Sequence, residues 1–284
     1  MTGMIWTGKL SNDLVLIIIT LAYKLMDWQE RTGILVGKAS LSGLAGKRVA
    51  VVGLGGVGAY AAEMLVRAGI GHMVVLDYDI VSYTDKNRQL LALDSTIGKT
   101  KCDVLKSRLC DINPGLDLVC IGKYILADDS GPEGTVQPKI PYPENSSHVY
   151  DLLSPYQLDY VIDAIDTLGP KLSLIKYCID NGIPLVSSMG AGAKFDITKI
   201  AISDISATNQ CPLAHMVRKR LHKIGIRTGF QAVYSEEVPL KDAIVHDESC
   251  NKKSQVGTIS YLPAAFGCCC AQAVICGLLK VNNT

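Results

Sequence analysis

The 284-residue chain lacks the cysteine spacings that mark metal-bound or disulfide-bonded folds. No two of its ten cysteines stand three positions apart, so a zinc ribbon built from C-x-x-C pairs is excluded and we expect no structural zinc site. The cysteines also lack the spacing of a secreted disulfide framework, which favours a reducing, cytoplasmic location. The 26 glycines follow no triplet period, and this excludes a collagen-like fibre.

An excess of either charge is also missing. The sequence has 28 Lys and Arg against 27 Asp and Glu, a formal net charge of +1. This balance excludes a globally basic nucleic-acid binder and leaves room only for a local basic patch.

The N-terminus lacks a segment long enough to span a membrane. Its apolar run, residues 14–22, covers nine residues, whereas a membrane-spanning helix needs about 20. Lys9 is the only basic residue before the run, and no small-x-small cleavage site follows the run; both facts disfavour a signal peptide. We interpret residues 1–25 as an N-terminal extension and expect no membrane association.

The rest of the chain, residues 26–284, is expected to form a single domain, because it shows no repeats and no internal linker. Short β-branched runs alternate with helical patterns along most of it. We expect strands at 49–52, 73–76, 116–121, 160–164 and 183–188, and helices at 59–68, 98–112 and 170–181. This alternation predicts a Rossmann-like α/β fold with a mainly parallel sheet and helices on both faces.

Two parts of the chain depart from the alternation. Residues 128–148 are rich in glycine and proline, which predicts a surface loop insertion. The last third adds a basic helix at 211–223, short strands at 200–203 and 231–235, and an apolar helix at 263–280. We therefore expect extra C-terminal strands and a C-terminal helix outside the basic Rossmann-like unit.

Four glycines, Gly53, Gly55, Gly56 and Gly58, stand between the first expected strand and the helix that follows it. Glycines at this spacing let the backbone approach a phosphate closely, and the helix presents free N–H groups and the positive end of its dipole. The strand before and the helix after make the pattern specific enough to predict a nucleotide site. Asp77 ends the second strand, where its carboxylate can accept both ribose hydroxyls.

A dinucleotide and a triphosphate would both suit these features, but later charged residues favour the triphosphate. Arg88 and Lys101 lie 11 and 24 residues beyond Asp77. Such cations are needed when charge builds on a leaving pyrophosphate. Asp163 and Asp166 end a later parallel strand, where one acid can hold Mg²⁺ that bridges the phosphates. The presence of Arg88, Lys101 and Asp166 disfavours an inactive nucleotide-binding scaffold. The lack of a histidine–acid pair for hydride transfer disfavours an NAD-dependent oxidoreductase.

The same stretches resemble the ThiF/MoeB superfamily of adenylating enzymes, which includes ubiquitin-activating E1 proteins. They are residues 51–58, 76–79, 87–89, 98–101 and 161–166. Further stretches resemble one branch of the superfamily, the tRNA threonylcarbamoyladenosine dehydratases. They are residues 163–171, 187–196, 204–206, 212–214, 218–221, 234–237 and 257–267.

The resemblance implies an enzyme that uses ATP and Mg²⁺ to adenylate the threonylcarbamoyl carboxylate on a tRNA adenosine next to the anticodon. Attack from within the same side chain then closes a ring and releases AMP, helped by the high effective molarity of an internal nucleophile. By motif position, the resemblance implies that the glycines and Asp77 bind the nucleotide, with Asp77 on the ribose. It implies that Arg88 and Lys101 contact the phosphates and that Asp166 binds Mg²⁺. The other residues implied to line the nucleotide site are Asp79, Asn87 and Asp163.

Two positions bear on assembly and on charge at the site. Arg31 matches an arginine that relatives insert into the phosphate site of the partner subunit, which implies a homodimer with shared active sites. Asp85 stands where relatives usually carry asparagine. A carboxylate beside a triphosphate is repulsive unless it binds metal or turns away. Docking of a sulfur-relay protein partner is left open by the sequence.

The segment 216–230 contains five Lys and Arg and no acid. A plain interpretation is a solvated helix face, but with the resemblance we favour contacts to tRNA phosphates. The residues expected to make them are Arg218, Lys219, Arg220 and Lys223.

An alternative function is E1-like adenylation of the C-terminus of a ubiquitin-like or sulfur-carrier protein. That chemistry would use a cysteine in a loop before a helix, a position that Cys211 occupies. We expect instead that Cys211 is a packed thiol. The consecutive Cys268, Cys269 and Cys270 point about 100° apart on a helix, so we interpret them as small core residues and not as a metal site.

Overall fold

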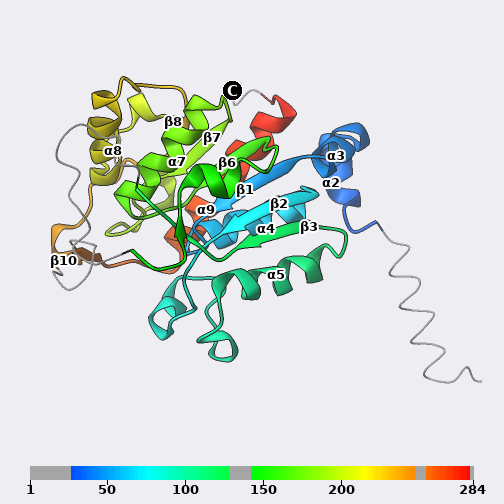
Figure 1. Ribbon diagram of the computed structural model, residues 1–284, viewed down its shortest axis with the longest axis horizontal. Coiled ribbons are helices and arrows are strands. Elements are labelled where there is room, and N and C mark those ends of the chain that lie inside the picture. Colours follow the sequence, from blue (N-terminus) through cyan, green and yellow to red (C-terminus); the bar gives the residue numbers. More distant parts are fainter. Residues whose placement is uncertain (1–26, 128–141, 247–253, 282–284) are drawn as a thin grey trace, which may run out of the picture.

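The computed structural model describes residues 27–127, 142–246 and 254–281 (Figure 1). The expected N-terminal extension, residues 1–25, and most of the expected insertion at 128–148 lie outside the described residues.

A seven-stranded sheet forms the centre of the domain (Figure 1). Its strands in spatial order are β3 (Asp117–Ile121), β2 (His72–Leu76), β1 (Arg48–Val52), β6 (Tyr160–Asp163), β7 (Leu185–Ser188), β9 (Gln231–Ser235) and β8 (Ile200–Asp204). All neighbours pair in parallel except β8, which runs antiparallel to β9. The Rossmann-like sheet is therefore confirmed. Because Val52 pairs with both Leu76 and Asp163, the loops after β1, β2 and β6 emerge together at one edge.

Alternate side chains of each strand face two separate hydrophobic cores. In β1, Val49 and Val51 belong to one core and Ala50 and Val52 to the other, as the two-residue period of a strand requires. The first core packs against α4 (Gly58–Ala68), α5 (Lys101–Ile112) and α9 (Tyr261–Leu279). The second packs against α6 (Val149–Leu153), α7 (Leu168–Asp180) and α8 (Pro212–Lys223). Helices on both faces of the sheet are thus confirmed (Figure 1).

The apolar helix α9 is the central helix of the first core. Phe266, Cys270 and Val274 are fully buried. A side chain at Gly267 would come within 2.5 Å of the carbonyl oxygen of Val57, so α9 packs closely on the start of α4. Among the described residues, α9 alone is long and apolar enough to cross a membrane. Its packing against α4 and the sheet accounts for that apolar composition within the fold.

Several short elements were not predicted. Before β1 lie two helices, α2 (Glu30–Val36) and α3 (Lys38–Ala45). Two small two-stranded sheets pair β4 (Tyr124–Ile125) with β5 (Ser146–Ser147) and β10 (Ile244–His246) with β11 (Ser254–Val256). The 3₁₀ helices are η1 (Tyr83–Asn87), η2 (Asp94–Thr96), η3 (Ile197–Lys199), η4 (Ile205–Ala207) and η5 (Lys241–Ala243). Strand β5 lies within the loop expected at 128–148, so the described end of that segment is not loop throughout.

A buried carboxylate joins α4 to α5. Glu63 on α4 accepts hydrogen bonds from Arg67 on the same helix, at 2.8 Å, and from Arg108 on α5. Burial opposes ionisation, but the hydrogen bonds from Arg108 and Arg67 outweigh it and lower the pKa of Glu63. The charged form of Glu63 is therefore more stable in the folded protein than in the unfolded chain.

The substitution Glu63→Gln is expected to lower the free energy of unfolding by about 1–3 kcal/mol near neutral pH, because it removes the negative charge that accepts three hydrogen bonds from Arg67 and Arg108. A lowered folded-state pKa gives stability that is present above the ordinary value of 4.5 and is lost as the pH falls through the folded value. The difference between wild type and variant in urea unfolding should therefore shrink below about pH 4.5. A difference that stays constant down to pH 3 would contradict this assignment.

Candidate active site

Two glycines of the turn between β1 and α4, Gly53 and Gly58, leave no room for a side chain. Gly53 has a φ of +90°, and a Cβ there would lie 2.7 Å from the carbonyl oxygen of Ala164. A Cβ on Gly58 would lie 1.8 Å from the carbonyl oxygen of Gly53. The turn therefore closes against the loop after β6 and points the N-terminus of α4 at the sheet edge. This is the geometry in which helix N–H groups bind phosphate.

Asp77 ties the loop after β2 to the glycine turn. Its Oδ2 accepts the N–H of Leu54 at 2.6 Å, and its Oδ1 accepts the N–H of Asp79 at 2.8 Å. Burial raises the pKa of Asp77, and the positive charge of Lys101 acts in the opposite direction. Each oxygen keeps a second lone pair, which suits a carboxylate that accepts hydroxyl donors.

Lys101 brings a nearly buried cation to the same edge. Its side chain is 6% exposed, and its Nζ lies 2.8 Å from Oδ2 of Asp79. Burial lowers the pKa of Lys101, but Asp77, Asp79 and Asp85 outweigh it, so that its pKa is raised. As the first residue of α5, Lys101 also stands where the helix dipole disfavours a cation. The acids keep Lys101 charged, and this positive charge would stabilise an anion that binds beside it.

The segment 87–89 lies directly over the glycine turn. A Cβ on Gly56 would be 3.3 Å from the carbonyl oxygen and 3.6 Å from Cγ of Arg88. The Arg88 guanidinium donates to the side-chain oxygen of Asn87 at 2.8 Å and to the carbonyl of Thr84 at 3.2 Å. The side-chain amide of Asn87 donates to the carbonyl of Thr258, and this bond connects the end of η1 to the C-terminal third of the chain.

Asp85 is turned into the protein. It is 7% exposed. It accepts the N–H of Ser82 at 3.0 Å, which closes the N-terminal cap of η1, and it accepts the side-chain amide of Gln89 at 2.7 Å. The same carboxylate lies 3.5 Å from the guanidinium of Arg88, so its negative charge is offset by a cation of the site and not left unpaired beside a phosphate.

The two acids after β6 are arranged differently from the sequence prediction. Asp163 is fully buried, and both of its oxygens are engaged by Ser187, Lys171 and the N–H of Ile165. It therefore cannot contact a nucleotide directly in this arrangement, which corrects the sequence expectation. Asp166, three residues on, is exposed.

The donor set fits a magnesium–nucleotide complex better than a free metal ion. Among the described residues, no group of three His, Cys, Asp or Glu could hold a metal. Mg²⁺ commonly uses one or two carboxylates together with substrate phosphates and water. The exposed Asp166 suits that kind of binding.

The sequence analysis did not predict an aromatic cluster that lies beside Asp79 and Asp166. Tyr78 and Tyr124 make an edge-to-face contact with ring centroids 4.8 Å apart, and Tyr142 lies 5.7 Å from Tyr124. Burial and the neighbouring Asp79 raise the pKa of Tyr78, so its hydroxyl stays protonated and the side chain stays neutral. Tyr78 directly follows Asp77 in the sequence, and this adjacency could have indicated it.

The basic residues of α8 lie mostly away from this edge. The helix begins at Pro212, directly after Cys211, which lies beside Gly190 just after β7, and its 12 residues extend about 18 Å from there. Arg220 and Lys223 stand in its last turn, where the helix dipole itself favours cations. Arg218 donates to the carbonyl of Thr208. Lys219 and Lys223 are exposed.

The remaining predicted residues are placed as follows. Arg31 is exposed on α2, which buries none of its residues. Cys211 is 4% exposed and packs against Gly190, as expected for a packed thiol. Of the three consecutive cysteines, Cys270 is fully buried but Cys268 is exposed, so the core interpretation is wrong for Cys268. A residue on the outer face of α9 turns away from the core by helical rotation alone.

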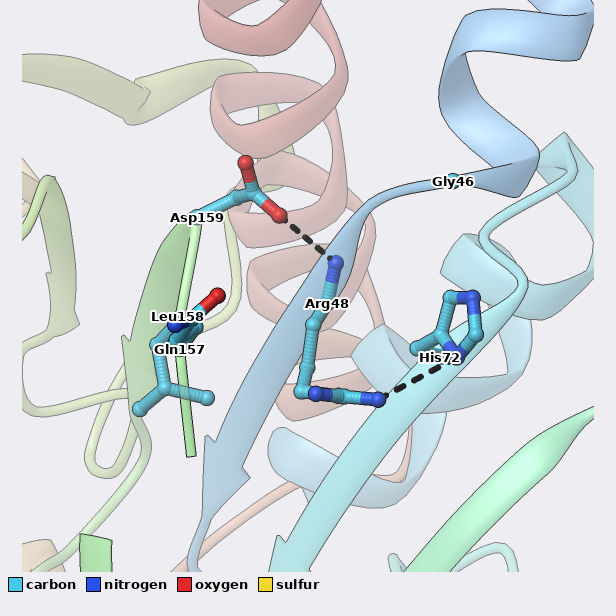
Figure 2. Close-up of a pocket in the computed structure, with 6 residues that line it drawn as sticks. All are labelled: Gly46, Arg48, His72, Gln157, Leu158 and Asp159. Atoms are coloured by element: carbon cyan, nitrogen blue, oxygen red, sulfur yellow. Dashed lines mark hydrogen bonds between the residues drawn. The ribbon is translucent and has the colours of Figure 1, made fainter. Parts of the chain in front are cut away.

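A separate cavity of about 280 Å³ lies at the opposite edge of the sheet, where β1 and β2 begin (Figure 2). Its charged groups already have partners. The Arg48 guanidinium lies 3.0 Å from Asp117 and 3.4 Å from Nδ1 of His72, and Asp159 accepts the N–H of Arg48 at 2.8 Å. Ligands of open parallel sheets bind at the carboxyl ends of the strands, so this cavity is not the candidate site.

Comparison with known proteins identifies the family of the chain. Residues 30–284 match the ThiF family. The chain is 38% identical over 259 residues to the tRNA threonylcarbamoyladenosine dehydratase of Bacillus subtilis, covering 88% of this chain and 94% of that protein. It is 35% identical over 232 residues to the Escherichia coli enzyme of the same name, covering 78% and 77%.

A solved structure is also similar. The crystal structure of E. coli tRNA N6-threonylcarbamoyladenosine dehydratase in complex with ATP matches with a TM-score of 0.74 and 31% identity, over 89% of this chain and 95% of that chain. The adenylyltransferase and sulfurtransferase UBA4 of Saccharomyces cerevisiae is 27% identical over 182 residues, 64% of this chain and 36% of that protein. The E1-like alternative therefore fits less well, and the chain belongs to the ThiF family, within the branch of the tRNA threonylcarbamoyladenosine dehydratases.

Proposed function

We propose that the protein is an ATP-dependent tRNA threonylcarbamoyladenosine dehydratase. The observation that carries this function is the glycine turn with Asp77, Arg88 and Lys101 gathered around it, in a chain 38% identical to a named dehydratase over nearly its whole length. A tRNA substrate implies a cytoplasmic location.

The chemistry requires activation of a poor acyl donor. The substrate carboxylate attacks the α-phosphorus of ATP, the bond between that phosphorus and the α,β-bridging oxygen breaks, pyrophosphate leaves with this oxygen, and an acyl adenylate forms. A nucleophile of the same side chain then attacks the acyl carbon and loses its proton, and AMP leaves with the carboxylate oxygen. The net change in the nucleoside is the loss of one water. Because the nucleophile is already adjacent, the protein need not supply a covalent one.

The nucleotide contacts follow from the geometry of the edge. The N–H groups of the glycine turn and the start of α4 would hold the phosphates, and Asp77 would accept the ribose hydroxyls. Lys101 and Arg88 would stabilise the charge that builds on pyrophosphate as it leaves. Asp79 would hold Lys101, and Asn87 would hold Arg88, so each cation is oriented before the nucleotide arrives.

The tyrosine cluster would enclose the base. The adenine is joined to the ribose, so it must lie within a few ångströms of Asp77, and the rings of Tyr78 and Tyr124 are the neighbouring apolar surface. Aromatic rings bind nucleobases by stacking. Asp166 would help to bind Mg²⁺ together with the nucleotide, and the metal would neutralise phosphate charge.

A homodimer with shared active sites suits the N-terminal helices. Ile34 and Leu35 on α2 are 78% and 84% exposed, and Trp28 is 50% exposed, an apolar face that a second copy would cover. Arg31 lies on the same short helix and would then reach the partner's phosphates. Contacts to tRNA are proposed for the exposed Lys219 and Lys223, and Arg218 is assigned to the fold. A sulfur-relay partner stays an open expectation.

The first test uses the nucleoside product. Purified protein incubated with ATP, MgCl₂ and threonylcarbamoyl-bearing tRNA should convert the modified nucleoside to one lighter by the mass of one water, and should form AMP and pyrophosphate only when that tRNA is present. Mass spectrometry of the digested tRNA gives the readout. Turnover with a ubiquitin-like protein, and none with tRNA, would favour the E1-like alternative.

The second test removes the phosphate-facing cations. Arg88→Ala and Lys101→Ala should each lower kcat/KM by about 10²-fold or more, because each cation stabilises the leaving pyrophosphate in the transition state. Circular dichroism should show both variants folded. Lys176→Ala, which removes a partly exposed lysine paired with Asp180 on α7, is the matched control and should keep the wild-type rate. Near-normal rates in both test variants would overturn the phosphate assignment.

The third test asks whether two subunits share a site. Arg31→Ala and Lys101→Ala should each be nearly inactive alone. When the two are unfolded together and refolded as a mixture, the mixture should regain about a quarter of the wild-type rate, since half of its dimers are heterodimers and each of these holds one complete site of two. Lys38→Ala on α3 is the control and should stay active. No recovery in the mixture, with dimers confirmed by sedimentation, would exclude shared sites.

A further inference from the structure

A fully buried ion pair lies next to the loop that carries Asp166. Nζ of Lys171 on α7 lies 2.8 Å from Oδ2 of Asp163 at the end of β6, and neither side chain is exposed. Nζ also donates to the carbonyl oxygens of Ile165, at 3.0 Å, and Ser188, at 2.9 Å. All three protons of the ammonium group therefore have acceptors.

The pair holds one loop residue from both sides. Oδ1 of Asp163 accepts the N–H of Ile165 at 3.0 Å, while Lys171 donates to the carbonyl oxygen of the same residue. Both peptide groups that flank Ile165 therefore have a fixed orientation. One leads back to Ala164, whose carbonyl closes on Gly53, and the other leads directly to Asp166.

Stability alone does not require this arrangement. Apolar residues of similar volume often stabilise a fold as much as a buried ion pair does, because the pair must first be desolvated. Lys171 also stands near the start of α7, where the helix dipole disfavours a cation. What the pair supplies, and apolar residues would not, is a directional hold on the backbone of Ile165.

We propose that Lys171 is a positioning residue, which together with Asp163 aims the Asp166 carboxylate at the magnesium-bound phosphates. This inference rests on the proposed function, since it concerns the ATP site of the dehydratase. Partners that orient a metal ligand typically change metal affinity or activity by about 10–100-fold when they are removed.

The test measures ATP binding and not turnover. Isothermal titration calorimetry of the full chain with ATP, without tRNA, is carried out once in excess EDTA and once in MgCl₂. The wild type should bind ATP more tightly in MgCl₂. Lys171→Met should lose about tenfold or more of that magnesium-dependent gain, because the carbonyl of Ile165, which leads to Asp166, is no longer held. Its affinity in EDTA should change little.

Ser187→Ala provides the matched control. The Ser187 hydroxyl donates to the same Asp163 oxygen at 2.6 Å, so its loss weakens the same buried network, but Ser187 does not touch Ile165. The control should keep the full magnesium-dependent gain. An equal loss in both variants would reduce Lys171 to a structural role and overturn the proposal, as would an unchanged gain in Lys171→Met.

A second variant covers the case in which Lys171→Met leaves an unpaired buried carboxylate and does not fold. The double substitution D163N/K171M removes both charges together and still releases the Ile165 carbonyl, so it should show the same loss of the magnesium-dependent gain. A gain equal to that of the wild type would overturn the proposal. The proposed function fails independently, through absence of the dehydrated nucleoside with the wild-type protein.

Discussion

The close packing of the glycine turn against the loop after β6 is the constraint on which the site depends. No side chain fits at Gly58, because its Cβ would overlap the carbonyl oxygen of Gly53, and Gly53 itself adopts a left-handed conformation against Ala164. This contact brings the ends of β1 and β6 together. Adjacent β2 then adds Asp77, whose carboxylate holds the N–H of Leu54 within the turn.

Charge at this edge is balanced before any nucleotide arrives. Lys101 is nearly buried at the start of a helix, an unfavourable place for a cation, and Asp79 with Asp77 keeps it charged. Arg88 is held in the same way by Asn87 and by the backbone of Thr84. Cations that are oriented in advance need little reorganisation when charge develops on a phosphate, which is the condition for electrostatic catalysis.

Local sequence patterns predicted the fold well where the signals are local. The β-branched runs, the glycine turn and the acid after β2 each depend on a few neighbouring residues, and the main strands and helices formed where expected. The paired two-residue strands β4 and β5 were missed because they exist only through pairing with a distant segment. The tyrosine cluster was missed for the same reason, since Tyr142 reaches Tyr124 through the fold.

The acids after β6 show a limit of another kind. The sequence places Asp163 and Asp166 at one sheet edge, but only the structure shows that Asp163 is the last residue of a buried strand and is neutralised by Lys171. A lysine in the first turns of a helix reads as a surface residue in sequence. Lys171 is buried because α7 packs against β6 and β7, and no local sequence pattern encodes that packing.

The most direct measurement is a crystal structure of the protein with ATP and MgCl₂. The expected result is a triphosphate over residues 53–58, with the Arg88 guanidinium and Nζ of Lys101 within hydrogen-bond distance of its phosphate oxygens. A nucleotide bound instead beside Arg48 and His72 at the opposite edge, or an ATP complex in which Arg88 and Lys101 face away from the phosphates, would contradict this description of the site.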